Sequence, residues 1–160
     1  SGLVGSEMCI RDSAKRVQNV VSLEPVKRHG EEVALISCKN KEEQYQNVKQ
    51  AIDRFLSGGN AALGIITKTN HMAKELYGIL KTEQSVNLIT PESSRFRNGV
   101  SVTSIQMAKG LEFDEVVVWD ADNRTYCTDF DRCLLYIACT RAMHKLTLIH
   151  TGEQTGLIRD

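Results

Sequence analysis

Residues 115–119 read EVVVW, and this continuous, largely β-branched run constrains the fold more than any other feature of the sequence. A strand without alternating polar positions is typical of a parallel sheet that is covered on both faces. Further short apolar runs predict five more strands, at residues 33–37, 61–67, 86–89, 100–105 and 145–150.

Segments with apolar residues at helical spacing separate several of these runs. They predict a helix over residues 41–56, a second helix that Asn70 caps, and a third that opens at Thr128. Asp131 lies three positions after Thr128, as in a capping box. Strands that alternate with helices imply right-handed crossovers. We therefore predict an α/β fold with a doubly wound, mostly parallel sheet.

The length of 160 residues matches one domain, with no linker-like stretch inside it. Residues 1–13 show neither strand nor helix periodicity, so we expect a non-native or disordered leader there and one domain over residues 14–160. No apolar run approaches the roughly 18–20 residues of a transmembrane helix, and we expect no membrane partner.

The net charge limits how the protein can bind nucleic acid, and its cysteine content indicates a redox compartment. Twenty basic and twenty acidic residues give a net charge of 0, so a local surface must bind any nucleic acid. The five cysteines are an odd number without a secretory signal before them. They predict buried, reduced thiols and a cytoplasmic location.

Neither a G-x-x-x-x-G-K-[ST] phosphate loop nor a G-x-G-x-x-G turn is present in the sequence. Residues 116–120 (VVVWD) are similar to the strand that ends in a magnesium-binding aspartate in NTPases. Without a phosphate loop, a polar strand end that faces a loop is the favoured interpretation of Asp120 and Asp122.

Residues 102–114 (VTSIQMAKGLEFD) form the first stretch with functional character, a strand that leads through a polar loop into a buried strand. Ligands of open parallel sheets bind where strands end at their carboxyl edge, and we expect this loop there. Gly110 permits a close backbone approach, Lys109 supplies a cation and Glu112 can accept from hydroxyls. A purely structural connection is the alternative.

Residues 130–143 (FDRCLLYIACTRAM) form the second stretch. An apolar stripe at helical spacing begins at Phe130 and continues through Leu134 and Ile137, and its next position is Arg141. An arginine on a hydrophobic stripe indicates either a functional residue or a cation that offsets the helix dipole.

Together the two stretches resemble motifs V and VI of superfamily 1 DNA helicases of the UvrD, Rep and PcrA type. The family pattern Val-x-Thr-x-x-x-x-x-Lys-Gly-Leu-Glu-Phe precedes Leu-Tyr-x-Ala-x-Thr-Arg-Ala, and LLYIACTRAMHKLTL at residues 134–148 follows the first stretch here. A weaker likeness covers residues 61–70 (AALGIITKTN). The resemblance implies the C-terminal RecA-like domain of the motor, called 2A, a P-loop NTPase-type fold without its own phosphate loop.

In such helicases ATP binds between 2A and the N-terminal 1A motor domain of the same protein. The resemblance therefore implies ATP with Mg²⁺ as the cofactor, with the ion held by 1A and no metal ligand in this chain. It also implies that 1A and single-stranded DNA are the partners. We expect the isolated chain to be inactive as an ATPase.

The resemblance assigns a role to each matching residue. It implies that Arg141 contacts the γ-phosphate, that Glu112 bonds the ribose and that Gly110 offers backbone near the phosphates, with Lys109 as a further ATP-binding residue. Residues implied to contact single-stranded DNA are Ser104, Gln106, Thr67 and Asn70.

Three departures from the family pattern stand beside these matches. Gln106 stands where the family often has histidine, and the motif IV arginine has no assigned counterpart, because Arg11 falls within residues 1–13. Only 30 positions separate Asn70 from Val100 (100 − 70), too few for the 2B insertion of UvrD and Rep. The chain is thus more similar to the HelD-like branch. The alternatives to a helicase are a HelD-like remodeller of RNA polymerase and a non-catalytic interaction module.

Overall fold

The computed structural model describes residues 21–22, 32–93 and 98–159, and every strand pair in it is parallel except one isolated bridge. Six strands form the main sheet in the order β2-β7-β6-β3-β5-β4. Their bounds are β2 Glu32–Cys38, β3 Ala62–Thr67, β4 Asn87–Leu88, β5 Gly99–Ser104, β6 Phe113–Val118 and β7 Ala142–Thr151. A separate pair joins β1 (Val21–Ser22) to β8 (Ile158–Arg159).

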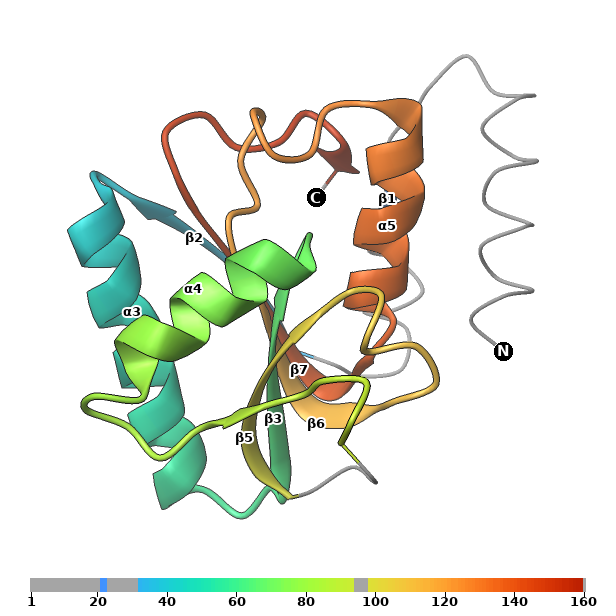
Figure 1. Cartoon of the computed structure of the whole chain (residues 1–160). Coiled ribbons are helices and arrows are strands. Elements are labelled where there is room, and N and C mark those ends of the chain that lie inside the picture. The colour runs from blue at the N-terminus through green and yellow to red at the C-terminus, as the bar shows by residue number, and fades with distance from the viewer. Residues whose placement is uncertain (1–20, 23–31, 94–97, 160) are drawn as a thin grey trace.

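Helices cover both faces of the main sheet, as the continuous apolar strands require (Figure 1). On one face, α3 (Lys41–Ser57) and α4 (Asn70–Leu80) pack apolar side chains against β3, β5 and β6. On the other face lies α5 (Asp129–Cys139). The prediction of a doubly wound parallel α/β fold is confirmed.

Strand β3 lies at the centre of the sheet between β5 and β6, and all six of its residues are buried. Its Gly64 is required by packing, because a Cβ there would come within 2.6 Å of the Phe113 ring. The absence of a side chain at Gly64 thus makes room for Phe113, the first residue of β6 (Phe113–Val118).

Two helix ends differ from the sequence prediction. The side chain of Thr69, and not of Asn70, caps α4 by accepting from the Met72 N–H. Helix α5 ends at Cys139, so Arg141 follows the helix instead of continuing its apolar stripe. The start of α5 is as predicted, with Thr128 and Asp131 in a reciprocal capping box.

The cysteine prediction is correct in part. Cys38 and Cys139 are free and buried. Cys127 is free but exposed, and Cys133 takes part in a disulfide bond, so buried reduced thiols are not the rule throughout.

The predicted leader at residues 1–13 lies outside the described residues. Within the described part of the chain, none of the helices has both the length and the apolar character that crossing a bilayer demands.

Candidate functional site

The segment from Ser104 to Phe113 runs from one end of the strands to the other. We call the side of the sheet where strands end the carboxyl edge, and the side where they begin the amino edge. Ser104 is the last residue of β5 and Phe113 the first of β6, and both strands run parallel to β3 between them. The connection therefore starts at the carboxyl edge and returns to the amino edge. The expectation that the whole loop lies at the carboxyl edge is wrong, because a parallel neighbour can only begin at the other edge. We call residues 104–113 the crossing segment.

At the carboxyl edge, a hydrogen bond joins Ser104 to Asn70, and Thr67 bonds their chain neighbours, Ile105 and Thr69. The Ser104 hydroxyl donates to Asn70 Oδ1, and the Ile105 N–H donates to the Thr67 carbonyl at 2.9 Å. The Thr67 hydroxyl donates to the Thr69 carbonyl at 2.8 Å. We call Thr67, Asn70 and Ser104 the carboxyl-edge cluster. Thr67 and Ser104 are buried and Asn70 is exposed, so Asn70 is the member that a ligand can reach directly.

At the amino edge, Arg141 links the end of α5 to the crossing segment. Its Nε donates to the Ile137 carbonyl at 3.3 Å, and its Nη1 donates to the Leu111 carbonyl at 3.4 Å. The Phe113 N–H donates to the Arg141 carbonyl at 2.9 Å. The first bond places the cation at the last turn of α5, as the helix-dipole interpretation predicts. The second places it against Leu111, between Gly110 and Glu112.

Gly110 and Glu112 are both exposed on the crossing segment. Gly110 has φ +78°, and no atom lies within 4 Å of the position that a Cβ would occupy. The backbone there is open to a ligand, and a residue with a side chain would be strained. The structure therefore groups Gly110, Glu112 and Arg141, three residues predicted to contact ATP, at one edge.

Gln106 and Lys109 lie between these two groups and are exposed. They line a cavity of about 360 Å³ between the crossing segment and α5, which also involves Lys68, Ile105, Phe130, Cys133, Leu134 and Ile137. Neither residue joins the carboxyl-edge cluster by a side-chain hydrogen bond in the described residues.

Lys68 lines the same cavity and is a candidate residue that the sequence analysis missed. Its Nζ lies 2.8 Å from Asp131 Oδ1 and donates to the Thr125 carbonyl, also at 2.8 Å. The pair connects the loop after β3 to the start of α5. A lysine between the predicted contacts Thr67 and Asn70 was the available signal, but its partner is 63 positions away (131 − 68) and could not be read from the sequence.

Asp120 and Asp122 hold protein groups. Asp120, in the left-handed region at φ 58°, accepts from Lys41 Nζ at 2.5 Å and from Gln44 Nε2 at 2.7 Å. Asp122 accepts from the N–H groups of Arg124 and Thr125. Both carboxylates thus fix loops at strand ends, as the favoured interpretation predicts. Among the described residues, no group of three or more His, Cys, Asp or Glu side chains is arranged to hold a metal ion.

Comparisons with known proteins indicate the family of the chain. The family model of the UvrD-like helicase C-terminal domain matches residues 99–149, a range that includes residues 102–114 and residues 130–143. No curated protein sequence is significantly similar to the chain.

Solved structures similar to the chain include two C-terminal domains of other proteins. The C-terminal domain of a possible DNA helicase from Lactobacillus plantarum WCFS1 has 32% sequence identity and a TM-score of 0.74, over 93% of this chain and 88% of that one. The C-terminal domain of the DEAD-box protein Dbp5 has 16% identity and a TM-score of 0.52, over 78% of this chain and 77% of that one. The second likeness concerns the fold alone.

Proposed function

The chain belongs to the UvrD-like helicase C-terminal domains, and from this membership we propose that it is the 2A motor domain of an ATP-dependent DNA helicase or translocase. In this role it completes an ATP site at the interface with a 1A domain and contacts single-stranded DNA. The observation that carries the proposal is the hydrogen bond from Arg141 Nη1 to the Leu111 carbonyl, because it unites the two predicted ATP-contacting stretches.

The residues at the amino edge fit a nucleoside triphosphate. Arg141 offers a planar guanidinium, which can bond two phosphate oxygens at once. Gly110 exposes backbone beside it, and the Glu112 carboxylate can accept from ribose hydroxyls. Mg²⁺ would be held by 1A, since Asp120 and Asp122 already bind protein groups. When bound, ATP with Mg²⁺ supplies the phosphoryl group whose hydrolysis drives the motor.

The residues at the carboxyl edge fit a nucleic-acid strand. Asn70 is exposed at the start of α4, and Gln106 is exposed on the crossing segment two positions after Ser104. Thr67 and Ser104 are buried and act by positioning, since the Ser104 hydroxyl holds Asn70 Oδ1. The Asn70 amide N–H groups then remain to donate to a strand.

A HelD-like remodeller of RNA polymerase is the second candidate, and one observation favours it. Helix α4 and strand β4 alone occupy the described connection between β3 and β5, where a 2B domain would be inserted. A partner of this kind would be detected by co-purification of the full-length protein with RNA polymerase. A non-catalytic module is the third alternative, and the following experiment excludes or supports it.

The decisive experiment replaces Arg141 in the full-length protein. Arg141→Ala should lower kcat for ATP hydrolysis on the order of 10³-fold or more, the range known for arginine fingers. Arg141→Lys should recover only a small part, because an ammonium cannot bond two phosphate oxygens in the same plane.

Steady-state ATPase assays measure both variants, and melting temperatures show that the fold persists. A cation that serves only the dipole of α5 would be replaced by lysine almost fully. Near-wild-type kcat in Arg141→Lys would therefore contradict the assignment.

A further inference from the structure

Helix α5 runs from one edge of the sheet to the other and so connects the two groups of the candidate site. Strand β6 ends at Val118 at the carboxyl edge, and β7 begins at Ala142 at the amino edge, because the two strands are parallel. The eleven residues of α5 form about 16 Å of helix between these edges (Figure 1). Arg141 follows the helix and bonds the Ile137 carbonyl in its last turn, so the position of α5 sets the position of the guanidinium.

The other end of α5 is held by Lys68. This lysine lies in the loop after β3, between two members of the carboxyl-edge cluster. Its Nζ lies 2.8 Å from Asp131 Oδ1, donates to the Thr125 carbonyl at 2.8 Å and lies 5.9 Å from the centre of the Tyr126 ring. The loop is thus tied to the segment that opens the helix by an ion pair, a hydrogen bond and a cation–π contact.

Burial and hydrogen bonding assign the Lys68 ammonium to the protein and not to a phosphate. The side chain of Asp131 is only 5% exposed and that of Lys68 26%. Asp131 Oδ2 accepts from the N–H groups of Cys127 and Thr128, which leaves Oδ1 for the cation. Two of the three ammonium N–H groups therefore have acceptors within the chain. Because an unpaired buried carboxylate is costly, removing the cation must disturb the start of α5.

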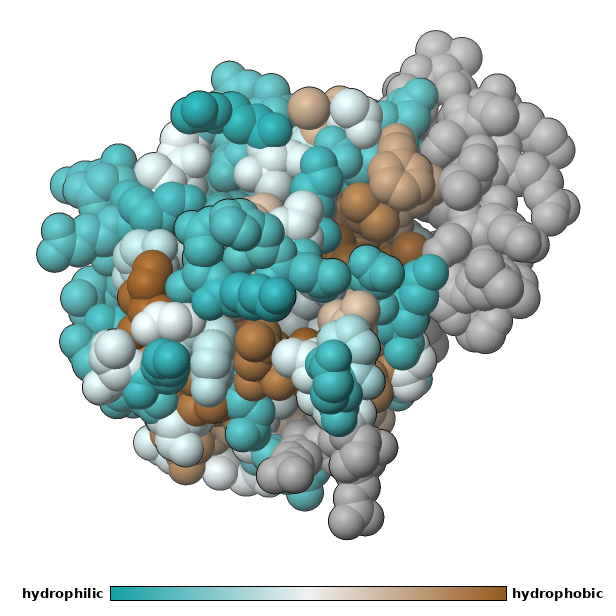
Figure 2. Space-filling model, in the orientation of Figure 1, coloured by the Kyte–Doolittle hydropathy of each residue, from teal (hydrophilic) through white to brown (hydrophobic). Residues whose placement is uncertain are grey.

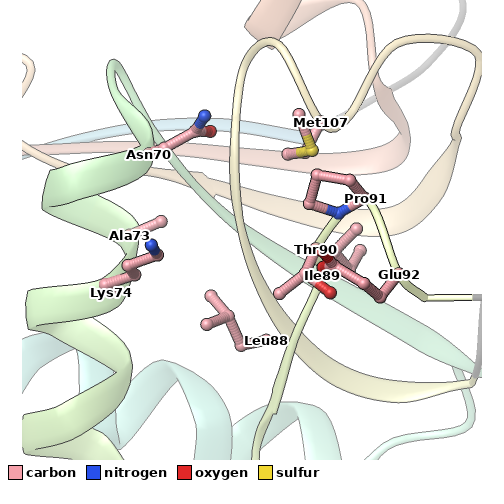
Figure 3. A pocket seen from close by; sticks show the side chains of 9 residues that line it. All are labelled: Asn70, Ala73, Lys74, Leu88, Ile89, Thr90, Pro91, Glu92 and Met107. Carbon is pink, nitrogen blue, oxygen red and sulfur yellow. The ribbon is translucent and has the colours of Figure 1, made fainter.

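The loop that carries Lys68 leads directly into the proposed DNA contact. Figure 3 shows Asn70 at the start of α4, across a cavity of about 260 Å³ from Met107. The Ser104 hydroxyl donates to Asn70 Oδ1 and accepts from the Met107 N–H at 3.1 Å. DNA that binds at Asn70 thus acts on a loop whose lysine is two positions away (70 − 68). Contacts are continuous from this loop through Asp131 to the end of α5.

We propose that Lys68 is a positioning residue that couples DNA binding at the carboxyl edge to ATP hydrolysis at the amino edge. DNA fixes the loop after β3, the Lys68–Asp131 pair passes this restraint to α5, and α5 orients Arg141. A chain of packed and hydrogen-bonded groups of this kind is the physical route by which distant sites influence each other. The inference rests on the proposed function, since it needs both the DNA contact and the role of Arg141.

The test compares kcat for ATP hydrolysis by the full-length protein with and without saturating oligo-dT. Lys68→Met keeps the length of the side chain and removes its charge. It should lower the ratio of the two kcat values about fivefold, the lower end of couplings between two sites. Lys68→Arg should retain most of the ratio, because a guanidinium also bonds a carboxylate.

Asp131→Asn should lower the ratio as Lys68→Met does, and the double variant should lower it no further, because the two residues act as a pair. Lys81→Met is the matched control, since Lys81 also lies over a tyrosine ring, that of Tyr77, but at the far end of α4. Its ratio should equal that of the wild type. Melting temperatures show that each variant folds, and Lys68→Gln replaces Lys68→Met if the latter does not.

Fluorescence anisotropy with labelled oligo-dT separates positioning from direct contact. The DNA affinity of Lys68→Met should equal that of the wild type. A weaker affinity with a salt slope reduced by about one would identify Lys68 as a phosphate contact and overturn the proposal. An unchanged kcat ratio in Lys68→Met would overturn it while the proposed function stands. A wild-type protein whose ATP hydrolysis does not respond to DNA would overturn both.

Discussion

Burial separates the free thiols of the described chain into two kinds. Cys139 is fully buried, and burial raises the pKa of its thiol to about 12. The pKa of the Cys38 thiol is also raised, mainly by burial and further by the Glu43 carboxylate. Cys127, in contrast, is exposed. The thiolate is the reactive form, so the two buried residues are protected both by access and by protonation.

Thiol labelling of the folded chain at pH 8 should therefore modify Cys127 and leave Cys38 and Cys139 intact. A thiol with a pKa of about 12 holds roughly a thousandfold less thiolate at this pH than an ordinary one. Peptide mapping by mass spectrometry identifies the modified residue, and labelling in denaturant is the control. Rapid modification of Cys139 in the folded chain would contradict the packing of α5 on the sheet.

The Lys68–Asp131 pair stabilises the beginning of α5. Asp131 Oδ2 accepts from the N–H groups of Cys127 and Thr128, and Oδ1 lies 2.8 Å from Lys68 Nζ. Burial by itself would raise the pKa of Asp131, but the Cys127 and Thr128 N–H groups and Lys68 together bring it below its usual value. The ionised carboxylate is thus the form that the fold favours.

Asp131→Asn should lower the free energy of unfolding by about 1–2 kcal/mol at pH 7, the range for lost helix caps. Because the folded pKa is the lower one, this stabilisation is complete above the unfolded pKa of about 3.9 and disappears as pH falls through the folded pKa. Denaturant unfolding at pH 7 and at several values below pH 4 measures it. Asp129→Asn, an exposed change in the same turn, is the control. A pH-independent difference would refute this account.

Element types followed from the sequence, while their ends depended on tertiary contacts. The helical periodicity of residues 130–143 continues past Cys139, yet α5 stops there because Ala142 pairs with Phe113 in the sheet. Strand β7 is longer than predicted since it lies between β2 and β6. Thr69 replaces Asn70 as the cap of α4, because Ser104 holds the Asn70 side chain.

The candidate site was predictable where a motif carries it and not where a single distant partner does, as with Lys68 and Asp131. The motif-like spacing identified Gly110, Glu112 and Arg141, and the structure places them at one edge. The sequence analysis did not place the predicted contacts at two edges, although the crossing segment divides them in this way. That division follows from the parallel direction of β5 and β6, which the predicted parallel sheet already implied.

The charge of the whole molecule limits how tightly it can hold a strand. Its net charge is 0, and Figure 2 shows polar residues over much of the visible face, with apolar ones only in small areas. Binding of oligo-dT to this chain should be weak, with a slope of log K against log salt of about −2, which corresponds to roughly three phosphate contacts. Anisotropy titrations at several salt concentrations measure it. Tight binding that persists at high salt would contradict contact through one local surface.

The chain should hydrolyse no ATP when assayed without a 1A domain. Its sequence has no phosphate loop, and its two candidate magnesium carboxylates bind protein groups. Phosphate release should equal the buffer control at all ATP concentrations. Release that persists through repurification and is absent in Arg141→Ala would show that the chain holds a complete site.

The first strand of the main sheet pairs only with the last. In the described residues, β2 aligns Glu32–Cys38 with residues 145–151 of β7, and β1 pairs with β8 in the same manner. During synthesis on the ribosome, β2 therefore stays unpaired until more than a hundred further residues have been made. A chain truncated before Ala142 would lack β7, and the backbone of β2, with its partly apolar side chains, would then be free to pair with other chains. Expression fragments of this domain should accordingly end beyond β7, and its folding should be slow for its size, because its pairings are distant in sequence.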